Sequence, residues 1–414
     1  MQELRLFGMP AERGRWVLVI LGMLINLCLG SIYSWSVFVG PLAAYFTDEL
    51  GRAVSANEVL LPFSVFLASF AFTMPLAGKY IEEWGPRKTT VVGGVLTGLG
   101  WLLASTVSSV EMLYLVYGVV GGVGVGIAYG VPVAVSARWF PDRRGLAVGL
   151  TVLGFGFSAF LTANIAGLLI AIAGVMATFR IFGIAFLLLI VLLALPLAFP
   201  PADWRPTGWV PGAASGGVAC ECNRGQMVRT PAFYGLWVCY FIGCLAGLMA
   251  ISIAKPVGTE LGIAPAFATV LVGFFAIFNG GGRPVFGSLT DRLDPRNTAM
   301  LSFVLIAGAA LALWLLPGEA TYIVAFAVLW GCLGGWLALA PAATGRFFGT
   351  CDYPRCYGLV FLAYGAGAIA GPQLAGFIKT TAGEYLGVFA YVVVLAAIGF
   401  AVAFALLRPP SPSP

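Results

Sequence analysis

Long runs of apolar residues dominate the hydrophobic pattern of this 414-residue chain. Each run has about 20 residues or more and few charges, which is the length an α-helix needs to cross a bilayer. The pattern predicts an all-α membrane protein with twelve transmembrane helices, and the first run is too long to be the apolar part of a signal peptide. The predicted spans are 16–40, 57–77, 88–108, 111–137, 144–173, 177–199, 230–254, 266–288, 297–317, 320–347, 355–380 and 384–408.

One segment in the middle of the chain interrupts this pattern. Residues 200–229 are rich in Pro and Gly and carry scattered charges, a composition typical of a linker. We therefore expect an N-terminal six-helix bundle over 1–199, a cytoplasmic linker over 200–229 and a C-terminal six-helix bundle over 230–414.

Composition excludes several classes of protein. Hydrophobic side chains make up 60% of the chain and charged ones 9%, whereas a typical soluble protein has about 25% charged residues. The chain has no His, which removes imidazole metal ligands and Ser–His catalysis. The eight Cys residues lie mostly within apolar runs and are interpreted as small apolar side chains. We expect no enzyme activity, no metal, no cofactor and no nucleic-acid partner.

The basic residues indicate an orientation in the membrane. If the N-terminus is cytoplasmic, most of the 22 Lys and Arg residues lie in inner segments, and the outer loops hold only Arg52, Lys255 and Lys379. This bias follows the positive-inside rule. We expect a multi-pass, monomeric protein of the cytoplasmic (inner) membrane, embedded in the lipid bilayer with both termini in the cytoplasm.

Two loop segments are related by a shift of 209 residues. The segment 78–88 (GKYIEEWGPRK) follows the second span, and 287–297 (GSLTDRLDPRN) follows the eighth. Gly, an acidic residue, Pro and Arg recur at matching places. Duplicated six-helix halves imply two pseudo-symmetric bundles with a substrate path between them, opened to alternate sides by rocking of one half against the other.

Several motifs carry a family resemblance. The string Gly-x-Leu-x-Asp-Arg at 287–292 resembles the signature loop of the major facilitator superfamily. The segments 33–38 (YSWSVF), 137–147 (ARWFPDRRGLA) and 279–284 (NGGGRP) are similar to segments of oxalate:formate antiporters and bacterial monocarboxylate transporters. The resemblance spans both halves and implies the major facilitator fold.

The repeated loops also suggest a gate. Asp291 and Arg292, with Glu82 and Arg87 in the matching loop, are interpreted as parts of an ion-pair latch that breaks when the cytoplasmic side opens. Exposed ion pairs stabilise by about 0–1 kcal/mol, enough to bias a balanced carrier. The alternative is that these side chains are solvated charges at helix ends.

Arg283 is the candidate counter-ion for an anionic substrate. A central Arg costs about 2.5–3.5 kcal/mol in a bilayer, and no predicted span has an Asp or Glu near its middle to pair with it. A guanidinium fits a carboxylate through two parallel hydrogen bonds. Asn279 lies one turn earlier on the same face and is expected to donate a further bond. The alternative is that Arg283 snorkels to the cytoplasmic headgroups.

Three Tyr residues are weaker candidates for the same pocket. Tyr33, Tyr129 and Tyr364 come from the first, fourth and eleventh spans, and each is either a ligand contact or a packing aromatic. Asn26 is interpreted as an interhelical hydrogen bond, and Arg180, near the outer end of the sixth span, as structural.

The resemblance narrows the substrate. Oxalate:formate antiporters carry a Lys in helix eleven, and alignment with that pattern puts Tyr364 at its position, so one fixed positive charge remains. A second, uncompensated carboxylate in a dry pocket costs several kcal/mol. We therefore expect a secondary active transporter for a small monocarboxylate such as lactate or pyruvate. The resemblance favours transport with a proton. Carboxylate anion exchange, a non-transporting membrane receptor and a multidrug exporter are the alternatives.

Overall fold

The computed structural model describes residues 4–140, 142, 144–201, 204–206, 223–349 and 353–409. Almost all of this part is helical. The first half contains a small antiparallel hairpin, β1 (Arg5–Leu6) and β2 (Met9–Pro10), followed by α1 (Ala11–Leu29), η1 (Gly30–Ser34), α2 (Trp35–Leu50), α3 (Ala56–Ala104), α4 (Val110–Leu113), η2 (Tyr114–Gly121), α5 (Gly122–Trp139), α6 (Arg144–Ala173) and α7 (Val175–Ala194). The second half contains α8 (Arg224–Met227), α9 (Pro231–Glu260), α10 (Pro265–Leu315), α11 (Glu319–Phe348), α12 (Tyr353–Ala382) and α13 (Val388–Leu406).

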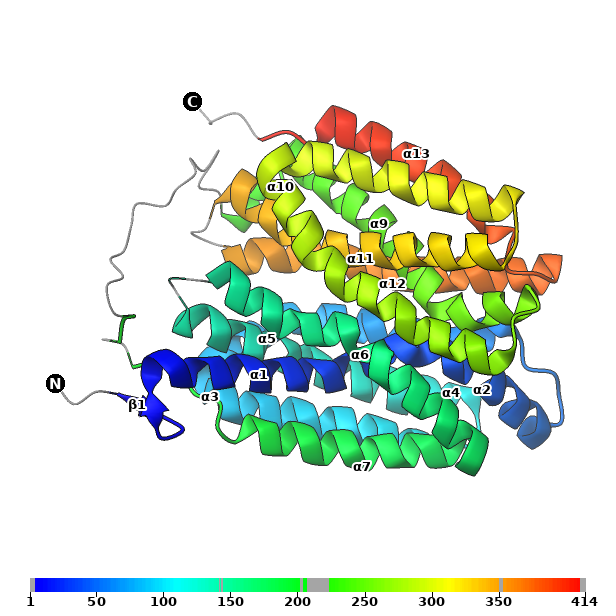
Figure 1. Ribbon diagram of the computed structural model, residues 1–414, viewed down its shortest axis with the longest axis horizontal. Coiled ribbons are helices and arrows are strands. Elements are labelled where there is room, and N and C mark those ends of the chain that lie inside the picture. Colours follow the sequence, from blue (N-terminus) through cyan, green and yellow to red (C-terminus); the bar gives the residue numbers. More distant parts are fainter. Residues whose placement is uncertain are drawn as a thin grey trace.

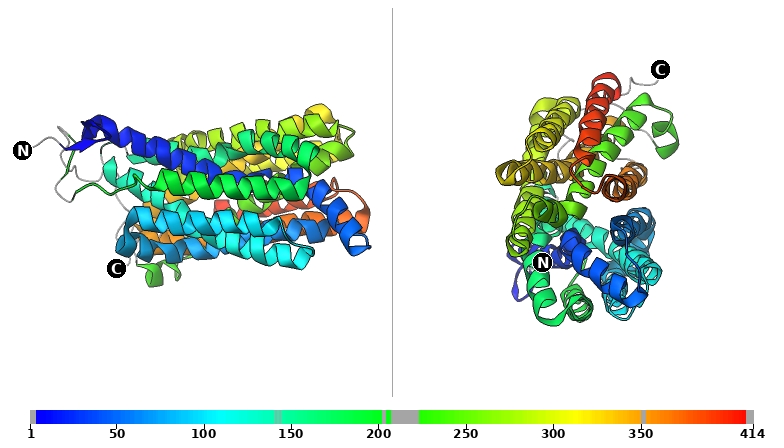
Figure 2. Two further views of the ribbon diagram at one scale, coloured as in Figure 1. Left: turned by 90° about the horizontal axis from the view of Figure 1, so that it is seen from below. Right: turned by 90° about the vertical axis from the view of Figure 1, so that its right-hand side faces the viewer.

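The helices form two bundles that lie side by side. In the end-on view of Figure 2, the blue-to-cyan helices of the first half and the yellow-green-to-red helices of the second half occupy separate groups. Both ends of the chain lie at the same end of the long helices (Figure 1). The bundles meet where α3 packs on α12 and α6 packs on α10. This arrangement confirms the predicted all-α membrane fold with two pseudo-symmetric bundles.

The number of spanning helices depends on where α3 is divided. Among the described residues, eleven helical segments are long and apolar enough to cross a membrane. The remaining predicted span, 88–108, corresponds to the part of α3 that follows a break at Gly85. Its start carries Arg87 and Lys88, and it is rich in Gly and Thr, so it is less apolar than the other eleven. With this segment included, the twelve spans predicted from the sequence are accounted for.

The internal repeat appears in the backbone. Within α3, Gly85 has φ 78° and ψ 169°, and within α10, Asp294 has φ 68° and ψ 162°. These positions are 209 residues apart, the shift found in the sequence. The hydroxyl of Thr89 donates to the Gly85 carbonyl at 2.9 Å, and that of Thr298 donates to the Asp294 carbonyl at 2.7 Å. Both halves therefore turn between two spans in the same way.

The first span differs from a simple helix. Its α-helical hydrogen bonding gives way to the 3₁₀ segment η1, which carries Tyr33. A Cβ at Gly30 would overlap the Phe155 carbonyl, so only Gly lets this segment approach α6 so closely. One turn earlier, Asn26 Nδ2 donates to the Thr151 carbonyl at 3.2 Å, which confirms the predicted interhelical hydrogen bond.

The buried Arg15, near the start of α1, joins segments of the first bundle that are distant in the sequence. Arg15 donates to both carboxylate oxygens of Asp142, at 2.6 and 2.9 Å, and to the Trp139 carbonyl at 3.0 Å. The guanidinium also lies over the Phe140 ring, 4.3 Å from its centroid. Trp204 packs on Trp139 with ring centroids 4.8 Å apart. The start of α1, the connection from α5 to α6 and the first residues of the predicted linker are thus fixed to one another.

Candidate functional site

The candidate site lies between the bundles and takes side chains from both. Each bundle contributes four of the residues that line it. They are Tyr33, Phe70, Tyr129 and Phe155 from the first, and Arg283, Leu337, Phe361 and Tyr364 from the second. The structure therefore brings together four of the five residues that we predicted for the pocket, from η1, α5, α10 and α12.

Arg283 is the charged residue of this site among those the structure describes. Its residue exposure is 5%, so it lies between the bundles and does not reach the lipid headgroups. Nη1 donates to the Val152 carbonyl of α6 at 2.8 Å, across the boundary between the halves. Nε and Nη2 are buried and have no hydrogen-bond partner within the described chain. The site therefore presents two unused guanidinium donors, and no acidic side chain is among its lining residues.

Aromatic rings form the rest of the wall. The hydroxyl groups of Tyr33 and Tyr364 are 3.1 Å apart, a hydrogen bond between the two bundles. Phe70 lies against the rings of Tyr129, Phe361 and Tyr364, with centroids 5.2, 5.7 and 5.9 Å away. Ring edges and faces suit the apolar body of a small ligand, and the hydroxyl groups suit its polar end.

The site is tightly closed in this conformation. The space between its side chains is too small for a water molecule. Tyr33 and Tyr364 are fully buried, whereas Tyr129 and Leu337 keep partial exposure. These two residues belong to α5 and α11, one in each bundle. The closed wall leaves no room for a ligand at Arg283 in this conformation.

Asn279 lies beside this site and not in its wall. It is completely buried, and Nδ2 donates to the Trp330 carbonyl of α11 at 3.1 Å. A Cβ at Gly156 of α6 would lie 2.8 Å from Asn279 Oδ1 and 3.0 Å from Arg283 Nε. Asn279 thus has a structural partner that the sequence did not reveal, and Gly156 leaves the room that both side chains occupy.

The predicted gate can be described only in part. The side chains of Asp291 and Glu82 lie outside the described residues. Arg87 and Arg292 are exposed, close to the matching breaks at Gly85 in α3 and Asp294 in α10. The latch stays a prediction. Arg180 is exposed on α7 and is not part of the site, as we expected from the sequence.

Sequence reasoning missed the non-tyrosine wall of the site. Phe70, Phe155, Phe361 and Leu337 lie in apolar runs, where nothing distinguishes a site residue from a core residue. One signal was available for Phe70. It precedes Asn279 by 209 residues, the repeat shift, so it occupies the matching place in the first half.

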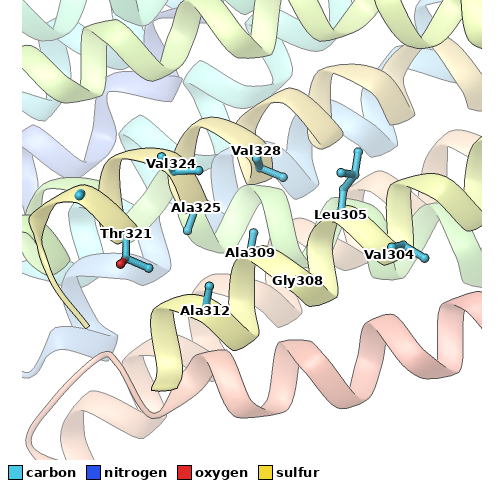
Figure 3. Close-up of a pocket in the computed structure, with 10 residues that line it drawn as sticks. Val304, Leu305, Gly308, Ala309, Ala312, Thr321, Val324, Ala325 and Val328 are labelled. Atoms are coloured by element: carbon cyan, nitrogen blue, oxygen red, sulfur yellow. The ribbon is translucent and has the colours of Figure 1, made fainter. Parts of the chain in front are cut away.

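A second pocket shares no lining residue with the Arg283 site. It has a volume of about 510 Å³ and lies between the second part of α10 and α11, with Ala309 and Ala312 on one side and Val324 and Val328 on the other (Figure 3). Apart from Thr321 its lining is apolar, and Val324 is exposed, as suits a lipid-facing surface. Within the described part of the chain, no three Cys, Asp or Glu side chains form a group able to hold a metal.

Comparisons with known proteins agree with this architecture. A bacterial homologue of the human lysosomal transporter Spinster, in an inward-facing conformation, has a similar structure, with a TM-score of 0.69 at 16% identity over 98% of this chain and 99% of that one. The oxalate:formate antiporter of Oxalobacter formigenes is 31% identical over 89% of this chain and 86% of its own. Monocarboxylate transporter 13 of Rattus norvegicus is 28% identical over 92% and 86%. The sequence profile of the Major Facilitator Superfamily matches residues 22–254 and 236–414, and the chain belongs to this superfamily.

Proposed function

We propose that the protein is a secondary active transporter for a small monocarboxylate, of the size of lactate or pyruvate. The observation that carries this proposal is the buried Arg283 guanidinium between the bundles, with two donors unused and no acidic partner in the described site. A buried charge needs a partner. A substrate carboxylate is such a partner, and it would join residues of both bundles.

The geometry gives each group a role. Nε and Nη2 of Arg283 donate to the two carboxylate oxygens, because a guanidinium matches a carboxylate in this way. The Tyr33 and Tyr364 hydroxyls, 3.1 Å apart, separate and bond to the polar substituent of the acid. Phe70 and Phe155 pack on its carbon chain. Since Arg283 and Tyr364 belong to one half and Tyr33 to the other, opening either side exposes the ligand to that side alone.

The count of charges supports a monocarboxylate over a dicarboxylate. Arg283 is the one cationic side chain in the lining that the structure describes. A dianion would keep one carboxylate unpaired at a cost of several kcal/mol. Relatives agree on small carboxylates as a class. Their names include, besides those above, the apicoplast pyruvate carrier 1 of Toxoplasma gondii, 25% identical over 90% of this chain.

We infer that transport is coupled to a proton that enters with the acid. The carboxylate stays ionised to pair with Arg283, so the proton moves with a bound water, because no acidic side chain is among the described lining residues. Exchange of one carboxylate for another is the second candidate, because the 31% identical relative is named an antiporter. Exchange is also favoured if a buried Arg283 without an anion makes reorientation slow.

The proposed setting is the cytoplasmic membrane, with both termini inside and the chain working as a monomer. The common location of the two termini supports an even number of spans (Figure 1). The bundle limits at 199 and 230 also remain a proposal, as does the latch of Asp291, Arg292, Glu82 and Arg87.

Uptake of radiolabelled lactate, pyruvate, acetate and oxalate into proteoliposomes tests the function. We expect pH-driven uptake of lactate or pyruvate without internal substrate, and little uptake of oxalate. Arg283→Lys should lower kcat/KM about 10- to 100-fold, because Lys keeps the charge but loses the planar fork that bonds to both carboxylate oxygens. Arg180→Lys, at an exposed position outside the site, is the matched control.

Unchanged kinetics in Arg283→Lys would overturn the proposed site. Uptake that begins only after the lumen is loaded with a carboxylate would replace symport by exchange. Uptake of oxalate in preference to lactate would contradict the assignment of a single carboxylate.

A further inference from the structure

A groove lies between the bundles at the end away from the two termini. Its walls come from α2 and α3 of the first bundle and from α9, α10 and α12 of the second, and its volume is about 630 Å³. The end of the molecule that holds α2 is opposite the termini (Figure 1). Thr259 and Pro265 are exposed at its edge, whereas Ser36 and Val59 are buried. The groove shares no lining residue with the Arg283 site.

Two of the charges in the groove neutralise each other. Lys379 Nζ lies 2.6 Å from Glu260 Oε1, and Glu260 Oε2 accepts a hydrogen bond from the Tyr385 backbone N–H at 2.8 Å. Burial raises the pKa of the Tyr385 hydroxyl, and the nearby Glu260 carboxylate adds to the effect, so this phenol stays neutral. Glu260 is the one acidic side chain in the described lining, and it is fully engaged.

Lys255 is the charge that remains. It lines the groove from α9, is partly buried, and has no ion pair or hydrogen bond within the described chain. The groove as a whole therefore carries one uncompensated positive charge. Its field attracts an anion, because a charge between low-dielectric walls acts more strongly than one on an open surface.

A buried hydroxyl in the groove also lacks a partner. Ser36 has a residue exposure of 1%, and its Oγ has no hydrogen bond to any part of the chain that the structure describes. A buried polar atom without a partner costs about 1–3 kcal/mol, and Ser36 lines the groove, so a ligand bound there would satisfy this hydroxyl. Val39, Val59 and Pro256 supply apolar surface next to it. A cation, a hydroxyl donor and an apolar wall match a short-chain carboxylate.

We propose that this groove is a second binding site of the transporter, an outer entry site in which Lys255 holds the carboxylate of the incoming acid and Ser36 donates a hydrogen bond to it. The inference rests on the proposed function, since it adds a first station for the same substrate. A groove of about 630 Å³ is larger than a three-carbon acid needs, so the anion is bound here with part of its water shell.

The first span links the two sites. Ser36 lines the groove and Tyr33 lines the Arg283 site, three residues apart, or about 4.5–6 Å along the axis for α-helical to 3₁₀ rise. Between them the backbone changes from the 3₁₀ segment η1 to α2, and a 3₁₀ stretch within a longer helix often marks a hinge. An anion leaving Lys255 reaches Arg283 past this segment, so movement of η1 both breaks the Tyr33–Tyr364 bond and opens the passage.

Initial uptake rates in right-side-out cells test the entry site. The variants are Lys255→Met, Lys255→Glu and Ser36→Ala, with Lys255→Arg as the conservative variant and Arg180→Met as a control that removes a positive charge outside the groove. For lactate or pyruvate, Lys255→Met should raise KM about three- to tenfold with little change in kcat, because a charge at an entry site acts mainly on the association rate. Lys255→Glu should raise KM further, and Lys255→Arg should retain the wild-type value.

Ionic strength provides a readout that a purely structural role would not change. Between about 0.01 M and 0.15 M salt the Debye length falls from about 30 Å to about 8 Å. The wild-type uptake rate at low substrate concentration should therefore fall as the salt concentration rises. This dependence on salt should be weaker in Lys255→Met. Equal KM and equal salt dependence in wild type and all Lys255 variants would overturn the entry site. If uptake still depends on Arg283 in that case, the proposed function stands. If the wild type takes up none of the acids, it is the proposed function that fails.

Discussion

The two halves of the molecule make the same backbone turn but contribute different side chains to the site. In α3 and in α10 the chain breaks at positions 209 residues apart, followed by a Pro and a Thr that bonds back to the break. A Pro also occurs ten residues before each break, at Pro75 and Pro284. The scaffold is therefore repeated down to the individual hydrogen bonds that the Thr side chains donate to the backbone at each break.

The side chains next to these Pro residues differ. Arg283 in the second half corresponds to Met74 in the first, and Asn279 corresponds to Phe70. The second half thus supplies the charge and the amide that lies beside it, and the first supplies the ring that contacts most of the aromatic wall, together with the Val152 carbonyl. A duplicated fold creates one asymmetric site because equivalent positions meet at the boundary with different chemistry.

Moving the charge from the second half to the first should have the largest effect on uptake. Arg283→Met should lower kcat/KM for lactate uptake at least 100-fold, since the carboxylate then has no counter-ion. The exchange Met74→Arg/Arg283→Met should not restore uptake, because Val152, Gly156 and the Tyr33–Tyr364 pair are arranged around position 283 alone. Radiolabel uptake into proteoliposomes measures both, and recovery in the exchange variant would show that the halves are interchangeable.

Crowding Arg283 from the first half should have an intermediate effect. Gly156→Ala places a Cβ 2.8 Å from Asn279 Oδ1 and 3.0 Å from Arg283 Nε, so one of them must shift. We expect a loss of about tenfold in kcat/KM, equivalent to about 1.4 kcal/mol. Gly149→Ala is the matched control on the same helix, since nothing lies within 4 Å of the added Cβ. Equal kinetics in the two variants would refute the positioning role of Gly156.

The smallest expected effect concerns the repeated break. Gly85 and Asp294 share a backbone region that essentially only Gly occupies without strain of about 1–3 kcal/mol. Asp294 offsets this strain by accepting hydrogen bonds from the backbone N–H and the side-chain amide of Asn297, at 2.9 and 3.1 Å. Gly85→Ala should therefore destabilise the protein by about 1 kcal/mol or more, whereas Asp294→Gly should be nearly neutral. Thermal unfolding in detergent measures both, and equal shifts in Tm would contradict this difference between the halves.

Much of the fold could be predicted from the sequence because the bilayer imposes a length and an apolar composition on every span. The isolated Arg283 was also evident, since a charge in an apolar run needs a partner wherever the helices lie. The wall of Phe70, Phe155, Phe361 and Leu337 could not be predicted, because the packing of one bundle against the other decides which apolar side chains face the site.

Two other features depended on tertiary contacts that a single-helix pattern does not contain. Helical spacing put Asn279 on the face of Arg283, but only the structure shows that the Trp330 carbonyl takes up its amide. No Pro in the sequence marks the change from α-helix to the 3₁₀ segment η1 in the first span. This change occurs where Gly30 lies close against α6.

The Arg15 cluster determines where the connection between the two bundles leaves the first bundle. Although α7 ends at Ala194, Trp204 still packs against the first bundle, with its ring centroid 4.8 Å from that of Trp139. On the other side, Met227 in α8 is already buried against the second bundle. The stretch of chain that joins these two anchors is the connection between the bundles. Shortening this stretch should therefore restrict the motion of one bundle relative to the other while leaving ligand contacts intact, and lengthening it should have little consequence.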